Sequence, residues 1–279
     1  MNPGRCRQEG SQATGTSGTV RMKAHIVLAH PEAKSFNGHL SGITQSALGA
    51  AGWQCTLSDL CAMDFDPRED ARHYASRKDA GVFHPQTEQR FNTENHSTPP
   101  DVDAEAQRIL DCDLLAIHFP LWWFGPPAIL KGWMDRVFVY GRMYRSTMRY
   151  DTGICAGKRM IACVTTGASE DNCAYNGREG DTRLHLWPIL YPFRYLGFDV
   201  LVPEIMHGVG STAFMEGREG GLSALDAYSN RWSEALAALP SRALVPYNRD
   251  SDFDDAKRLL PDAPVFSPFI RHNPDATPQ

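Results

Sequence analysis

The chain has 279 residues, enough to bury one full core with some additions, and its 42% hydrophobic and 22% charged residues are typical of soluble globular proteins. The net charge of −5 argues against a nucleic-acid partner held through its phosphates, and no apolar run is long enough for membrane insertion. Seven cysteines without a Cys-x-x-Cys pair predict a reducing, cytoplasmic location, and ten scattered histidines favour no metal site.

The first predicted unit is a strand followed by a helix. Residues 1–21 are rich in Gly, Ser, Thr, Gln and Arg and are expected to be a disordered leader. Residues 23–29 (KAHIVLA) predict the first strand. Apolar residues recur at spacings of three and four over residues 36–51, which predicts a helix that Gly52 ends.

The loop between them, residues 30–37, has the features of an anion-binding turn. A helix N-terminus offers unpaired amide groups and the positive end of its dipole, and Lys34 and Ser35 add a cation and a hydroxyl. The loop has neither a G-x-G-x-x-G nor a P-loop pattern. An ordinary capped turn is the alternative interpretation.

The next segment contains a second strand and a long connection. Residues 53–60 (WQCTLSDL) predict the strand, and residues 103–110 predict a helix that leads into the third strand. Residues 63–100 between them are polar and weakly patterned. A loop of that length in a compact domain is usually functional.

The most informative stretch covers residues 113–144. Residues 114–119 predict a buried strand, residues 120–125 form a turn with three consecutive aromatic residues, and residues 126–140 predict a helix that opens with two prolines. Aromatic residues usually pack in cores. Three in succession in one turn cannot all face one core, so at least one is expected to border a cavity.

The fourth and fifth strands are predicted at residues 159–164 and 198–202. The small residues 165–169 (TTGAS) follow the fourth strand and allow a ligand to approach the backbone closely. Residues 172–181 are rich in turn formers, and residues 184–196 predict a helix.

Beyond the fifth strand, the sequence predicts a loop, one more helix and a tail. Residues 208–213 match G-x-G-x-x-A, but no further strand with a ribose-binding acid follows, so a surface loop is the favoured interpretation. Residues 222–239 predict the last helix. The Pro- and Asp-rich residues 241–279 are expected to wrap over a surface.

This order of elements predicts an α/β fold over residues 22–240, a doubly wound sheet of five parallel strands with helices on both faces. Ligands bind at the carboxyl ends of such strands, and three loops leave those ends: residues 30–37, 120–125 and 165–168. The first suits a phosphate, the second a flat ring, and the third offers amides to the polar edge of a ring. Together they predict a flavin site of the flavodoxin type.

The chain resembles the NAD(P)H:quinone oxidoreductases of the DT-diaphorase type, which have a flavodoxin-like fold. The matching pieces are AHPEAKSFN (29–37), FPLWWFGPPAILKGWMDRVF (119–138), TTG (165–167), LWPI (186–189) and GFDVLVP (197–203). The resemblance implies a homodimer that binds FAD rather than FMN, since the long connection 63–100 belongs to the FAD-binding members. The tail, residues 241–279, lies beyond the matching pieces, and we expect it to pack on its own domain or on the dimer partner.

The resemblance assigns cofactor contacts to the three loops. The positions that match the family's flavin contacts are His30, Phe36, Asn37, Leu121, Trp122, Trp123, Phe124, Thr165, Thr166 and Gly167. We expect Ser35, Pro120 and Ala168, which lie in the same loops, to contact the cofactor as well. Tyr144 matches a family tyrosine that lines the substrate pocket from the partner subunit, and a surface tyrosine is the alternative interpretation. Trp123 and Phe124 are also expected to contact the substrate.

The loop after TTG departs from the family. The family has a tyrosine and a histidine there, and an ungapped alignment places Cys173 and Glu179 at those positions. Tyr175 could replace the tyrosine by a loop shift, and Glu179 could relay a proton only if burial kept its carboxyl protonated. We therefore expect catalytic roles for Tyr175, Glu179 and the amide of Gly167.

The implied activity is a ping-pong hydride transfer from NADH or NADPH, through the flavin, to a quinone or similar small aromatic acceptor. Three alternatives stay open: a flavin-binding regulatory subunit of a potassium efflux system, an electron carrier without hydride chemistry, and a nitro, azo or pathway-specific reductase.

Overall fold

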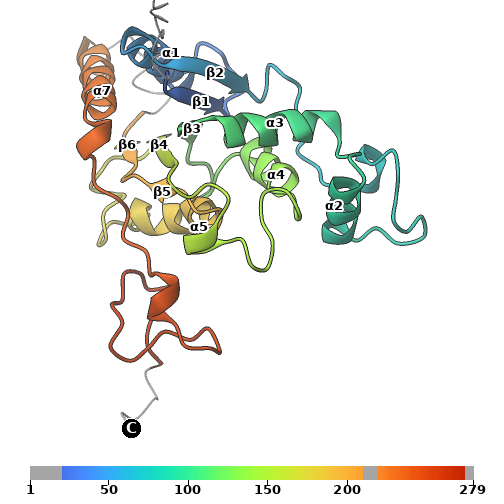
Figure 1. Cartoon of the computed structure of the whole chain (residues 1–279). Helices are drawn as coiled ribbons and strands as arrows, with labels where there is room; N and C mark the ends of the chain where they lie inside the picture. Colours follow the sequence, from blue (N-terminus) through green and yellow to red (C-terminus); the bar gives the residue numbers. More distant parts are fainter. Residues whose placement is uncertain (1–20, 210–218, 274–279) are drawn as a thin grey trace, which may run out of the picture.

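The computed structural model describes residues 21–209 and 219–273 (Figure 1). The predicted leader, except for its last residue, lies outside the described residues. So does the predicted G-x-G-x-x-A loop from residue 210 onward.

A parallel sheet forms the centre of the molecule, with its strands in the order β2-β1-β3-β4-β5 (Figure 1). The strands are β1 (Lys23–Leu28), β2 (Gln54–Asp59), β3 (Leu114–Pro120), β4 (Arg159–Thr165) and β5 (Asp199–Val200). All neighbouring pairs are parallel, and β3 is buried along its whole length, as expected for a strand covered on both faces. The predicted five-stranded parallel sheet is confirmed.

The edge strand beside β4 is shorter than predicted and is divided in two. β5 pairs with the first residues of β4, and a further strand, β6 (Glu204–Met206), pairs with its last residues. Pro203 stands between them and has no amide hydrogen to continue the ladder. The amide of Val202 instead donates to the carbonyl of Ala243 in the tail.

Helices cover both faces of the sheet, as Figure 1 shows. On one face, α1 (Phe36–Ala50) and α7 (Glu219–Ala237) share a core with Ile26 of β1 and Ala116 of β3. On the other face, α3 (Pro100–Asp111), α4 (Ala128–Val137) and α5 (Thr182–Tyr195) pack against the opposite sides of the same strands. The doubly wound prediction is therefore confirmed.

The long connection 63–100 was predicted without regular structure, and here the prediction was wrong. It holds a 3₁₀ turn (Ala71–His73) and α2 (Pro85–Glu94). Polar contacts hold α2 in place: the buried carboxylate of Glu88 accepts hydrogen bonds from the amides of Lys78 and Asp79. The helix therefore needs no apolar face, and its strongly polar sequence shows no apolar periodicity from which it could be predicted.

Several helix boundaries differ from the prediction by one to three residues, and two of the shifted starts lie at prolines. α3 begins at Pro100, three residues before the predicted start, and α4 begins at Ala128, after the two prolines and not at them. Proline is tolerated at a helix start or just before it, so both positions are compatible with its fixed φ.

A 3₁₀ turn at Leu239–Ser241 leads into the tail, which contains a second 3₁₀ turn at Asp250–Asp252 and touches the domain along α5. The ring of Phe269 stacks on Trp187 with centroids 4.7 Å apart. Arg194 of α5 pairs with Asp151 and donates to the carbonyl of Asn248.

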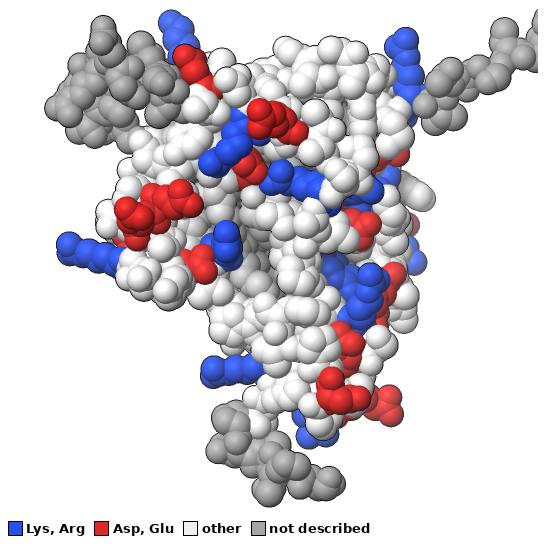
Figure 2. Space-filling model, turned by 90° about the vertical axis from the view of Figure 1, so that its left-hand side faces the viewer, with Lys and Arg blue, Asp and Glu red and all other residues white. Residues whose placement is uncertain are grey.

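Charged side chains of both signs are mixed over the face shown in Figure 2, without a large area of one sign. No helix among the described residues is long and apolar enough to cross a membrane. Within the same residues, no group of three or more His, Cys, Asp or Glu side chains could hold a metal ion.

Candidate functional site

The three predicted ligand loops lie together because β1, β3 and β4 are neighbours in the sheet. Asn37 Nδ2 in the first loop donates to Thr165 Oγ1 at the third, over 2.8 Å. The amide of Leu121 donates to the carbonyl of Thr165, also over 2.8 Å. The rings of His30 and Trp122 meet edge to face, 5.8 Å apart. The predicted convergence of the three loops is thus present in the structure.

The first loop ends in a helix N-terminus with free donors. Ser35 is the N-cap of α1, and its hydroxyl accepts the amide of Gly38. The amides of Phe36 and Asn37 donate no hydrogen bond within the described part of the chain. A Cβ atom at Gly38 would lie 2.2 Å from the carbonyl oxygen of Ala33, so the fold of this loop requires glycine.

The side chain of Phe36 points into the core, whereas its backbone amide has no partner among the described residues. Its ring is 7% exposed, belongs to the core between the sheet and α1, and packs near Tyr228. Lys34 is exposed, and its amide donates to the carboxylate of Glu32.

The second loop is a two-residue turn with strained backbone. Trp122 and Gly125 exchange hydrogen bonds of 2.9 and 3.0 Å, and the residues between them, Trp123 and Phe124, have φ values of 50° and 60°. Positive φ at both central positions is the mark of a type I′ turn, which favours Asn and Gly. For other residues it costs about 1–2 kcal/mol each.

This turn exposes its aromatic side chains. The exposed fractions are 45% for Trp122, 96% for Trp123 and 53% for Phe124, whereas Leu121 packs against the core. All three aromatic side chains therefore stay out of the core, and the expectation that at least one of them borders a cavity stays a prediction. Bulky residues in a strained and exposed turn suggest a binding function, since strain tends to be kept at functional sites.

The third loop offers backbone donors to open space. Thr165 is buried beneath it, and the hydroxyl of Thr166 donates to the carbonyl of Ala168. The amides of Gly167 and Ala168 have no acceptor among the described residues. Among the described residues, nothing lies within 4 Å of a Cβ atom built at Gly167, so this part of the chain leaves room for ligand atoms beside it.

The predicted catalytic residues of the next loop are less well placed. Tyr175 is 85% exposed and Glu179 is also exposed, so the burial that a proton role for Glu179 requires is not present. Cys173 is buried, and its carbonyl accepts the amide of Thr182 at the start of α5. Cys173 therefore fixes the path of the loop.

Two histidines that the sequence did not single out stand beside the three loops. His185 of α5 packs on Phe124, with ring centroids 5.0 Å apart. His207, just after β6, has its Nδ1 3.0 Å from the hydroxyl of Thr166, and burial lowers its pKa. Sixty residues separate His185 from Phe124 in the chain, so no local pattern could have joined them.

Tyr144 is half-buried within this chain. Its ring meets those of Tyr140 and Tyr195 edge to face at 5.3 and 5.5 Å, and its hydroxyl accepts from Gln86 Nε2. These contacts connect α2 and α5 and involve none of the three loops.

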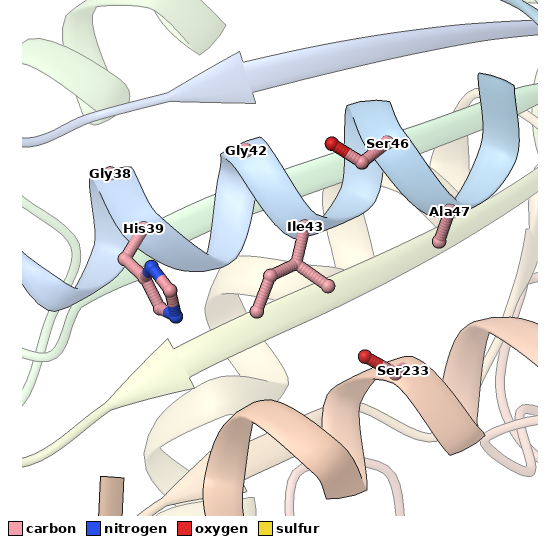
Figure 3. A pocket seen from close by; sticks show the side chains of 7 residues that line it. All are labelled: Gly38, His39, Gly42, Ile43, Ser46, Ala47 and Ser233. Atoms are coloured by element: carbon pink, nitrogen blue, oxygen red, sulfur yellow. The ribbon is translucent and has the colours of Figure 1, made fainter. Parts of the chain in front are cut away.

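Two hollows elsewhere on the surface differ from this site. Figure 3 shows the first, where His39, Ile43 and Ala47 of α1 face Ser233 of α7. The second, of about 1320 Å³, lies between residues 146–152 and the tail. Neither is lined by any residue of the three loops.

Comparison with known proteins gives consistent matches over the same part of the chain. The family model described as "Flavodoxin-like fold" matches residues 22–229. NAD(P)H dehydrogenase [quinone] 1 of Cavia porcellus is 39% identical over 194 residues, which are 68% of this chain and 70% of the relative. Ribosyldihydronicotinamide dehydrogenase [quinone] of Homo sapiens is 35% identical over 226 residues, covering 80% of this chain and 94% of the relative.

A solved structure agrees with these matches. The crystal structure of a putative quinone reductase from Klebsiella pneumoniae superposes with a TM-score of 0.74 at 27% identity, and covers 88% of this chain and 93% of its own. The resemblance drawn from the sequence motifs is thereby confirmed: the chain belongs to the flavodoxin-like family and is an oxidoreductase.

Proposed function

We propose that the protein binds a flavin on its three loops and passes two electrons from NADH or NADPH to a quinone or a similar small aromatic acceptor. The observation that carries this proposal is the strained turn at Trp123 and Phe124. The turn presents two exposed rings, and the neighbouring third loop carries the amides of Gly167 and Ala168, which have no acceptor among the described residues. The names of the quinone-reducing relatives support the choice of acceptor.

The donors and acceptors of these loops fit a flavin. Such a group needs donors for its phosphate, apolar contact for its rings and hydrogen bonds at its polar edge. The amides of Phe36 and Asn37 supply the first, at a helix N-terminus. Asn37 Oδ1 is buried and has no partner among the described residues, so it can accept from a bound group.

Each residue has a task in the proposed reaction. A bound flavin would supply the ring that accepts a hydride and passes it on. Trp123 and Phe124 would stack on planar groups, exclude water and orient the donor and then the acceptor in one space. The amides of Gly167 and Ala168 would donate to negative charge that develops at the polar edge. A shared space for donor and acceptor predicts ping-pong kinetics.

The identity of the flavin and the quaternary structure extend this proposal. We favour FAD over FMN because the chain carries the long connection that contains α2. We also propose a homodimer in which Tyr144 reaches the partner's site and the tail contributes to the contact. A cytoplasmic location stays a prediction.

Reconstitution tests this function directly. The protein, stripped of flavin, is titrated with FAD or FMN while flavin fluorescence is followed, and NADPH-dependent menadione reduction is then measured. We expect saturable binding with FAD preferred and parallel double-reciprocal plots. Trp123→Ala should weaken binding, and Leu57→Ala, at another exposed apolar position, is the matched control. If neither flavin binds, or if intersecting plots exclude a shared space, the proposal is wrong.

A further inference from the structure

His185 lies between the aromatic turn and the loop that follows the third ligand loop. It occupies the first turn of α5, which begins after the N-cap Asp181. Its ring contacts Phe124 at a centroid distance of 5.0 Å. A Cβ atom at Gly180 would lie 3.6 Å from its Cε1 and Nε2 atoms, so the backbone of that loop runs close to the imidazole.

Both ring nitrogens of His185 lack a hydrogen-bond partner among the described residues, and the side chain is half-buried. The other two histidines of the site each use one nitrogen to hold a loop. His30 Nδ1 accepts the amide of Glu32 at 3.0 Å. His207 must donate from Nδ1 to Thr166, because the single hydroxyl hydrogen of Thr166 goes to Ala168. Of these three histidines, His185 alone has both nitrogens available for proton exchange.

The proposed reaction needs such a group. Reduction of a quinone to a hydroquinone adds two electrons and two protons. One proton arrives with the hydride, and the other must come from an acid. Glu179 and Tyr175 are both exposed to solvent. His185 is half-buried and contacts Phe124 of the aromatic turn.

We propose that His185 is the acid that completes acceptor reduction, an inference that rests on the proposed function. An N–H bond of the imidazolium breaks as an O–H bond forms on the acceptor oxygen, and the neutral imidazole regains a proton from solvent. A hydrogen bond from the imidazole of His185, held beside Phe124, would also orient the acceptor oxygen. The site therefore selects aromatic acceptors that carry a carbonyl or another basic oxygen.

The test compares His185→Gln with His96→Gln, a matched change of an exposed histidine remote from the three loops. Three rates are measured: bleaching of the reconstituted flavin by NADPH, reduction of menadione and reduction of ferricyanide. Ferricyanide takes up electrons without protons. We expect His185→Gln to lower kcat/KM for menadione by about 100-fold, as is typical for loss of a general acid, with bleaching and ferricyanide reduction unchanged.

A second measurement does not depend on turnover. In protein labelled with ¹³C at histidine Cε1, the resonance missing from His185→Gln identifies His185. This resonance should move when resorcinol, a redox-inert aromatic diol, is added. An unmoved resonance, unchanged menadione reduction, or an equal loss with both acceptors would each overturn the inference. Failure of NADPH to bleach the parent protein would instead refute the proposed function itself.

Discussion

Substitution of Trp123 by asparagine should make the flavin-free protein more stable while weakening flavin binding. Trp123 is 96% exposed, so its replacement loses only about 0.2 kcal/mol of apolar burial. Its φ of 50° costs about 1–2 kcal/mol for an ordinary L-residue, and asparagine tolerates this conformation well. We expect a net gain of about 0.5–1 kcal/mol in the free energy of unfolding.

The same substitution removes an aromatic platform. Stacking of a ring on an aromatic side chain contributes about 1–3 kcal/mol in comparable sites, so flavin affinity should fall by about tenfold to a hundredfold. Urea unfolding of the flavin-free protein and fluorescence titration with FAD measure the two effects separately.

Trp123→Val is the control, because it should change the free energy of unfolding in the opposite direction. It also removes the ring, but a β-branched residue is disfavoured at positive φ, so it should lower the free energy of unfolding by about 1 kcal/mol. If the asparagine and valine variants were equally stable, or if either bound FAD as tightly as the parent, the link between strain and binding would be refuted.

Three further predictions concern the surroundings of the site. Gly38→Ala should lower the free energy of unfolding by about 1–3 kcal/mol in a urea melt, because the new Cβ would lie 2.2 Å from the carbonyl oxygen of Ala33. Asn37→Ala should cost about 1–3 kcal/mol, since it strands the buried Thr165 hydroxyl, and FAD titration should show weaker binding. Burial lowers the pKa of His118 to about 3, so its contribution to stability should be complete above pH 6.5 and decline as the pH falls toward 3. His118→Gln should make stability less dependent on pH over that range, and an unchanged pH profile of unfolding would contradict this.

The sequence predicted the sheet well because its central strands are short apolar runs. Residues 114–119 and 159–164 have no polar face, and only a strand covered on both sides needs such a pattern. The edge was less predictable. Pro203 divides the fifth strand, and the amide of Val202 turns to the distant Ala243, a contact that no local pattern encodes.

The site was predictable where its chemistry is local. The N-cap at Ser35 and the aromatic turn can be recognised from neighbouring residues, and each lies where a strand of the sheet ends. The strain at Trp123 could not be predicted, since Trp-Phe is a poor sequence for a type I′ turn. His185 was missed because its partner, Phe124, lies in another element, and the tertiary fold alone brings the two rings together.

The most direct test of the account is anaerobic mixing of the FAD-reconstituted protein with one equivalent of NADPH in a stopped-flow spectrophotometer. We predict that the absorption of the oxidised flavin bleaches in a single turnover and returns when menadione is added. An absorption spectrum that NADPH leaves unchanged, in protein shown to hold FAD, would contradict the claim that these three loops form a site for hydride transfer.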